Sequence, residues 1–157
     1  MLLKIKEFVV ILLFAAFIAL INMKTVYIDV PVDTIINAIS DEAGLDEMTE
    51  YSATDIKAEF GININDYKGV AYYGHDSVMD CETLLVVCLN DKSQGDAIIA
   101  TISEQRDELI KLFQSYAPDQ YELLRGSVLV QKDKYILYVV DQDAKEVEAA
   151  FIDCITE

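Results

Sequence analysis

Two strongly apolar runs constrain the fold of this chain more than any other feature of its sequence. They are TLLVVCL at residues 83–89 and YILYVV at residues 135–140. Because neighbouring side chains of a strand point to opposite faces of a sheet, strands with these sequences should be covered on both faces. The runs therefore predict a central sheet with helices packed against it.

Weaker patterns predict the elements around these two strands. GVAYYG (69–74) and SVLVQ (127–131) indicate two more strands, giving a mainly antiparallel four-stranded sheet. Helical periodicity or capping residues indicate helices at 31–44, 52–60, 94–116 and 144–155, with one or two further turns at 119–124 after Pro118. The predicted class is α+β. An echo between residues 86–102 and 137–152 favours a ββα-ββα pseudo-repeat, with chance similarity as the alternative.

An uninterrupted apolar run at residues 8–21 predicts a membrane anchor. Its length alone fits either a short transmembrane helix or the core of a signal peptide. No small-residue cleavage pattern follows the run, so a retained anchor is favoured over a cleaved signal or a buried helix. The predicted organisation is a cytoplasmic tail (1–7), a transmembrane anchor (8–23), a tether (24–31) and an extracytoplasmic domain (32–157).

The distribution of charged residues predicts the orientation of the anchor and excludes nucleic acid as a partner. Lys4 and Lys6 precede the apolar run, and the positive-inside rule then directs the rest of the chain to the outer side of the cell membrane. The chain has 28 acidic and 12 basic residues and a net charge of −16. Such a domain is repelled by nucleic acid and by anionic lipid, so no nucleic-acid partner is expected.

The cysteines and the acidic segments carry no metal-binding or redox motif. Cys81, Cys88 and Cys154 have no C-x-x-C spacing, so small buried thiols are expected, with a Cys88–Cys154 bridge as the alternative. The acid-rich residues 41–50 and the loop 90–96 both depart from the alternating oxygen ligands of an EF-hand. Neither a metal nor a cofactor is predicted.

A candidate surface site lies where the first two strands meet their connecting loop. His75 is the sole histidine and is followed by Asp76, with Asp80 and Cys81 a few residues further on. Imidazole, carboxylate and thiolate groups are the usual ligands of transition metals, whereas the simpler interpretation is a polar hairpin loop. The adjacent Tyr72 and Tyr73 should point to opposite faces, so core packing is favoured over a carbohydrate-stacking platform.

Other catalytic patterns are missing from the sequence. There is no G-x-S-x-G motif, no Walker motif and no dinucleotide-binding glycine pattern. His75 would have to serve as the base for any serine or cysteine nucleophile. No catalytic residue is therefore assigned.

The chain beyond its apolar N-terminal run resembles a known family. The stretch RDELIKLFQSYAPDQYELL at 106–124, followed by VLV, YILYVVDQD and AAF, is similar to the bacterial extracytoplasmic domain-of-unknown-function family 4358. Members lie behind an anchor or a lipoprotein signal in Gram-positive anaerobes. The likeness covers about residues 32–155, and Asp133-Lys134 replaces a glycine common in the last hairpin. The matching positions are Arg106, Phe113, Tyr116, Pro118, Gln120, Val128, Val130, Tyr135 and Phe151. The resemblance implies the family's topology and location, and no activity.

These observations favour a non-enzymatic function. The leading hypothesis is a binding or accessory module, held at the membrane by its N-terminal helix, for an envelope protein or component. The alternative is a cell-envelope enzyme or metal-dependent hydrolase that uses the His75 loop.

Overall fold

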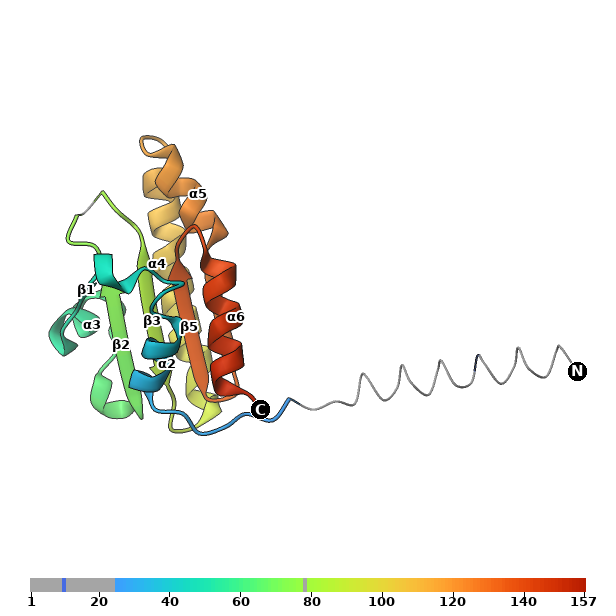
Figure 1. The fold of residues 1–157 in the computed structure, drawn as a ribbon. Coiled ribbons are helices and arrows are strands. Elements are labelled where there is room, and N and C mark those ends of the chain that lie inside the picture. Colours follow the sequence, from blue (N-terminus) through green and yellow to red (C-terminus); the bar gives the residue numbers. More distant parts are fainter. Residues whose placement is uncertain (1–9, 11–24, 78) are drawn as a thin grey trace, which may run out of the picture.

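A five-stranded antiparallel sheet forms the centre of the part of the chain that the structure describes (Figure 1). The structure is a computed structural model, and it describes residues 10, 25–77 and 79–157. The strand order is β1-β2-β3-β5-β4. The strands are β1 (Thr49–Glu50), β2 (Gly69–Gly74), β3 (Thr83–Cys88), β4 (Val128–Lys132) and β5 (Tyr135–Val140). The predicted α+β class is confirmed, whereas the predicted count of four strands is wrong.

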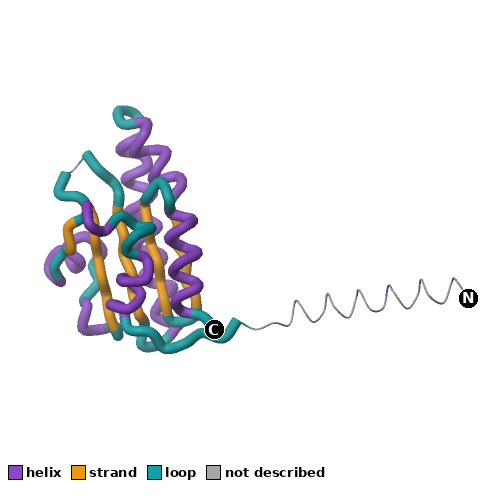
Figure 2. The backbone as a smooth tube through the Cα atoms, in the orientation of Figure 1, coloured by secondary structure: helices purple, strands orange, loops and turns teal. Residues whose placement is uncertain are grey.

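Helices cover both faces of this sheet, as the tube in Figure 2 also shows. The helices α2 and α6 pack on one face, and α3, α4 and α5 contribute to the core on the other. Their bounds are α2 (Val32–Ile39), α3 (Ala53–Phe60), α4 (Gly95–Phe113), α5 (Pro118–Gly126) and α6 (Ala144–Ile155). The helices that follow the two hairpins, α4 and α6, thus lie on opposite faces. The sequence echo reflects a shared order of elements rather than a symmetric repeat.

The two apolar runs form the middle of the sheet, as predicted. All of β5 is buried, and so is β3 apart from its first residue. Alternate residues divide between the two cores: Leu84 and Leu137 face α2 and α6, whereas Leu85 and Ile136 face α3, α4 and α5. Each core is therefore built from one set of alternating strand residues and one layer of helices.

Local signals account for the start of α3 and for the β4–β5 turn. The Asp55 carboxylate accepts a hydrogen bond from Ser52 N–H (2.9 Å), and the Ser52 hydroxyl oxygen accepts one from Asp55 N–H (3.4 Å), which together form the predicted capping box. In the two-residue turn between β4 and β5, Asp133 adopts a φ of 51°. Aspartate tolerates this left-handed conformation better than most residues, so the hairpin closes without a glycine.

Three helix ends differ from their predicted positions. Helix α2 ends at Ile39 rather than Gly44, and the nearby Ser40 hydroxyl donates to the carbonyl of Asn37, a bond that competes with helix continuation. Helix α4 ends at Phe113, before Tyr116. Helix α5 is longer than predicted because Pro118 occupies its first turn, where a missing N–H has no effect.

The segment before α2 is fastened to the C-terminal end of the chain. Backbone hydrogen bonds join Ile28 N–H to the carbonyl of Ile155 (3.0 Å) and Glu157 N–H to the carbonyl of Val26 (3.1 Å). The buried Tyr135 hydroxyl accepts from Val30 N–H (2.8 Å) and donates to the carbonyl of Ile28 (2.9 Å). Residues 26–30 of the predicted tether are therefore part of the folded body.

The predicted anchor at 8–23 and tail at 1–7 lie outside the described residues, apart from Val10. Where the structure does describe the chain, it contains no helix with both the length and the apolar character that crossing a membrane requires.

All three cysteines are free thiols, so the alternative of a Cys88–Cys154 bridge is wrong. Cys81 and Cys88 are buried, and burial raises the pKa of each thiol to about 12. Cys154 is partly exposed, and burial raises its pKa as well. The expectation of small buried thiols therefore holds for two of the three.

The native protein is expected to expose a single reactive thiol. At pH 8 a thiol of pKa near 12 is ionised in roughly one molecule in 10,000, and the thiolate is the reactive form. Ellman's reagent should therefore modify Cys154 alone in the native protein and all three cysteines after unfolding in guanidinium. The Cys154→Ser variant should lose the native reaction. Rapid modification of two thiols in the native state contradicts the burial of Cys81 and Cys88.

Candidate functional site

The loop of residues 75–82 brings His75 and Glu82 together at one end of the sheet. Gly74, the last residue of β2, pairs with Thr83, the first residue of β3. His75 directly follows the first strand and Glu82 directly precedes the second, so the two side chains start from opposite positions across the hairpin. The distance from His75 Nε2 to Glu82 Oε2 is 3.2 Å. Strand pairing therefore sets this contact.

Asp80 completes a cluster of three potential metal ligands. One ligand atom from each of His75, Asp80 and Glu82 lies within 4.8 Å of the other two, and all three residues are half-buried. We refer to these three residues as the His75 cluster. One imidazole and two carboxylates are groups that coordinate transition metals and that also transfer protons.

Hydrogen bonds fix the loop that carries the His75 cluster. The Tyr51 hydroxyl donates to the carbonyl of His75 (2.8 Å). The Glu82 N–H donates to Asp80 Oδ1 (3.1 Å), which orients the Asp80 carboxylate. On the other side, the Cys81 N–H donates to Gln120 Oε1 (2.8 Å) of α5. The loop is thus held between the start of α3 and the start of α5.

The carboxylates near His75 are crowded with negative charge. Burial raises the pKa of Glu82, and the nearby Asp80 and Asp141 raise it further, while His75 acts in the opposite direction. Burial also raises the pKa of Asp141, which directly follows β5. Among the described residues, His75 is the one basic side chain that forms an ion pair with Glu82 or Asp80. The cluster therefore carries excess negative charge when His75 is neutral.

The other predicted site residues do not join the His75 cluster. The Tyr72 ring stacks on Tyr51, with centroids 4.8 Å apart, and meets Phe60 edge-on at 5.1 Å. Tyr73 packs against the core on the opposite face of the sheet. This confirms the prediction that two neighbouring residues of a strand point to opposite faces. Asp76 lines the adjacent cleft and lies outside the cluster. Of the four predicted site residues, Tyr72, Tyr73, His75 and Asp76, only His75 belongs to the cluster, and the nearby Cys81 lies outside it as well.

Glu82 was not identified as a site residue from the sequence, whereas Asp80 was noted only as a carboxylate a few residues beyond His75. The sequence does contain one indication that Glu82 lies near His75. His75 directly follows β2, Glu82 directly precedes β3, and these two strands form a hairpin. In a hairpin, residues at these two positions face each other across the strand pair. The position of Asp80 depends on the course of a loop that no sequence pattern specifies.

A groove runs from the His75 cluster along α4. One cleft of about 330 Å³ is lined by residues that include His75, Asp76, Asp80, Tyr51 and Phe113. A second cleft of about 370 Å³ is lined by Glu59, Gln105, Glu108, Leu109 and Leu112. Both clefts include Glu59 and Leu109, so they adjoin. We refer to the two clefts together as the α3–α4 groove.

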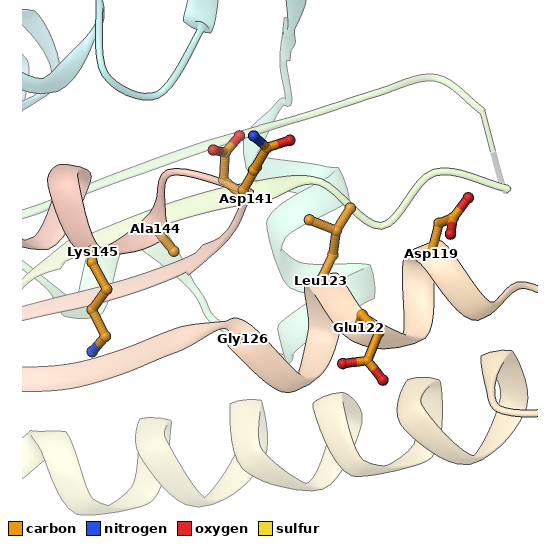
Figure 3. A pocket seen from close by; sticks show the side chains of 8 residues that line it. Asp119, Glu122, Leu123, Gly126, Asp141, Ala144 and Lys145 are labelled. Carbon is orange, nitrogen blue, oxygen red and sulfur yellow. The ribbon is translucent and has the colours of Figure 1, made fainter.

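A third cleft lies between α5 and the start of α6 (Figure 3). Its volume is about 430 Å³, and its walls include Asp119, Glu122, Asp141 and Lys145. In Figure 3 the Lys145 ammonium lies well away from Asp141, and its ion-pair partner is Glu148, at 3.1 Å. This cleft is therefore an acidic recess in which Lys145 does not neutralise Asp141.

Comparison with known protein families identifies the family of this chain. The family model described as Domain of unknown function (DUF4358) matches residues 41–141, which is more than half of the chain. The chain belongs to the DUF4358 family. Comparisons with curated proteins and with solved structures give no significant match.

The DUF4358 match has a clear structural meaning. It starts after α2 and ends before α6, so it contains all the strands of the sheet and the helices α3, α4 and α5. The complete His75 cluster and Asp141 lie within it. The helices of the opposite face, α2 and α6, lie outside the matched residues. The DUF4358 region is therefore the sheet together with the face that carries the α3–α4 groove.

Proposed function

We propose that this DUF4358 protein is a membrane-anchored, extracytoplasmic and non-enzymatic binding module for an envelope protein. The N-terminal apolar run and the lysines before it support the location. The strongly negative net charge supports a role away from nucleic acid and anionic lipid surfaces. The observation that carries the binding role is the α3–α4 groove.

The groove combines exposed apolar surface with negative charge. Leu112 is 55% exposed, and Leu109 beside it forms part of both clefts. Four carboxylates line the groove, and neither lysine nor arginine is among its described lining residues. The carboxylates are Glu59, Asp76, Asp80 and Glu108. By charge complementarity, the partner is a polypeptide segment with basic and apolar side chains.

Site-specific crosslinking in native membranes tests this proposal. A photoreactive amino acid replaces Leu112 in the groove in one variant of the full chain and Ala149 on α6 in another. Ala149 is exposed on the opposite face of the sheet, so it is a matched control. We expect a specific adduct from position 112 alone, and mass spectrometry should locate the crosslink in a basic, apolar segment of an envelope protein.

The groove charges should determine the affinity for that segment. A synthetic peptide of the crosslinked segment is expected to bind the purified protein roughly tenfold more weakly after Glu59→Lys and Glu108→Lys together, because each reversal replaces a surface attraction by a repulsion. Asp153→Lys, an exposed change on α6, should leave the affinity unchanged. Equal crosslinking from both faces, or hydrolysis of an envelope substrate by the purified protein without any partner, contradicts the proposal.

A further inference from the structure

The spacing of the His75 cluster corresponds to the spacing of ligands around a small metal ion. Zinc binds nitrogen and oxygen ligands at about 2.0–2.1 Å in a tetrahedron, which places two ligands roughly 3.3 Å apart. His75 Nε2 and Glu82 Oε2 are 3.2 Å apart. The atoms of the cluster all lie within 4.8 Å of one another, so Asp80 needs to move by at most about 1.5 Å to reach the same spacing.

Hydrogen bonds restrict the backbone of His75 and the carboxylate of Asp80. The Tyr51 hydroxyl holds the backbone of His75, and Glu82 N–H holds one oxygen of Asp80. Groups that orient metal ligands in this way strengthen metal binding, because the ligands then lose less freedom when the ion binds. His75 and Glu82 are also fixed by the strands on either side of the loop.

The charge around the cluster favours a cation. With His75 neutral, Asp80 and Glu82 are two carboxylates that no described lysine or arginine pairs with. Asp141, which directly follows β5, adds a further negative charge near Glu82. A divalent ion between the three side chains offsets this charge and takes the place of the direct contact between His75 and Glu82.

We propose that His75, Asp80 and Glu82 bind one divalent transition-metal ion of the zinc class. Imidazole suits zinc and its neighbours in the first transition row, whereas calcium and magnesium prefer sites built from oxygen alone. Three protein ligands leave a coordination position open. His75 and Asp80 line the cleft at the end of the α3–α4 groove, so the proposed ion lies beside the groove. The metal site does not depend on the binding role of the groove.

Zinc titration of the metal-free full chain tests the site. The chain is purified in detergent without a polyhistidine tag and carries Cys154→Ser, which removes the partly exposed thiol. Isothermal titration calorimetry with zinc chloride should give one equivalent of bound zinc, and zinc should raise the Tm. His75→Ala and Glu82→Gln should each weaken zinc binding at least about 100-fold and abolish the Tm increase.

Three further measurements distinguish this site from nonspecific zinc binding, from loss of folding and from a site that uses Cys81. Asp76→Asn, the neighbouring carboxylate outside the cluster, should retain zinc binding, and circular dichroism should show that every variant is folded. Cobalt should give the visible absorption of a low-coordinate site in the parent chain and lose it in His75→Ala. The proposal is overturned if zinc does not bind, if binding survives both ligand substitutions, or if Cys81→Ala removes it while Asp80→Asn does not.

Discussion

Replacing Phe151 by alanine is expected to lower the free energy of unfolding by about 3–5 kcal/mol. Phe151 is completely buried on α6, in the core that this helix forms with α2 and the sheet. The substitution removes a large apolar surface and leaves a cavity that the surrounding strands cannot fill. Because small domains are stable by only about 5–15 kcal/mol, equilibrium unfolding in urea should show a large shift of the midpoint.

Two other substitutions on α6 serve as references for this measurement. Asp153→Ala, at an exposed position of the same helix, should change stability by less than about 0.5 kcal/mol. Phe151→Leu should fold and lose less stability than the alanine variant, which keeps the comparison interpretable if Phe151→Ala does not fold. A loss below about 1 kcal/mol for Phe151→Ala contradicts the packing of α6 on the sheet.

Replacing Tyr135 by phenylalanine is expected to cost about 1–3 kcal/mol, because it leaves the Val30 N–H without its partner. Val30 is 5% exposed, so water cannot readily replace the lost hydroxyl. The same substitution removes the bond to the carbonyl of Ile28. Amide hydrogen exchange should therefore accelerate at Val30 and at neighbouring Ile28, in addition to the global loss measured in urea.

Tyr116 provides the control for the loss of a tyrosine hydroxyl. Its side chain is 50% exposed, so Tyr116→Phe should change stability by less than about 0.5 kcal/mol. If Tyr135→Phe leaves exchange at Val30 unchanged, the hydroxyl does not hold residues 26–30 against the body.

The sequence predicted the centre of the fold because burial on both faces leaves a clear pattern. The runs that form β3 and β5 are almost entirely apolar, as expected for strands whose side chains are buried on both faces of the sheet. Strand β1 was missed for the opposite reason. Its two residues, Thr49 and Glu50, are exposed and belong to an acid-rich segment, and only their pairing with β2 makes them a strand. Helix α5 was underestimated because its apolar positions are few and Leu124 alone is buried.

The candidate site was predictable only in part, because it depends on register. His75 could be singled out as the sole histidine beside a strand end. Its contact with Glu82 follows from the pairing of Gly74 with Thr83, which sequence alone does not establish. Asp76, the neighbour in sequence, does not join the cluster, whereas Asp80 does. Proximity along the chain was therefore a poor guide to proximity in the loop.

The hydrogen bonds of residues 26–30 determine where the N-terminal part of the chain joins the folded body, and this point lies away from the His75 cluster. These residues contact Tyr135, the first residue of β5, whereas the cluster lies beside Val140, its last residue. From its first to its last residue, β5 spans roughly 17 Å at about 3.3 Å per residue. If the apolar run at 8–21 is the anchor proposed above, the chain that follows the anchor joins the domain at the end of β5 opposite the His75 cluster.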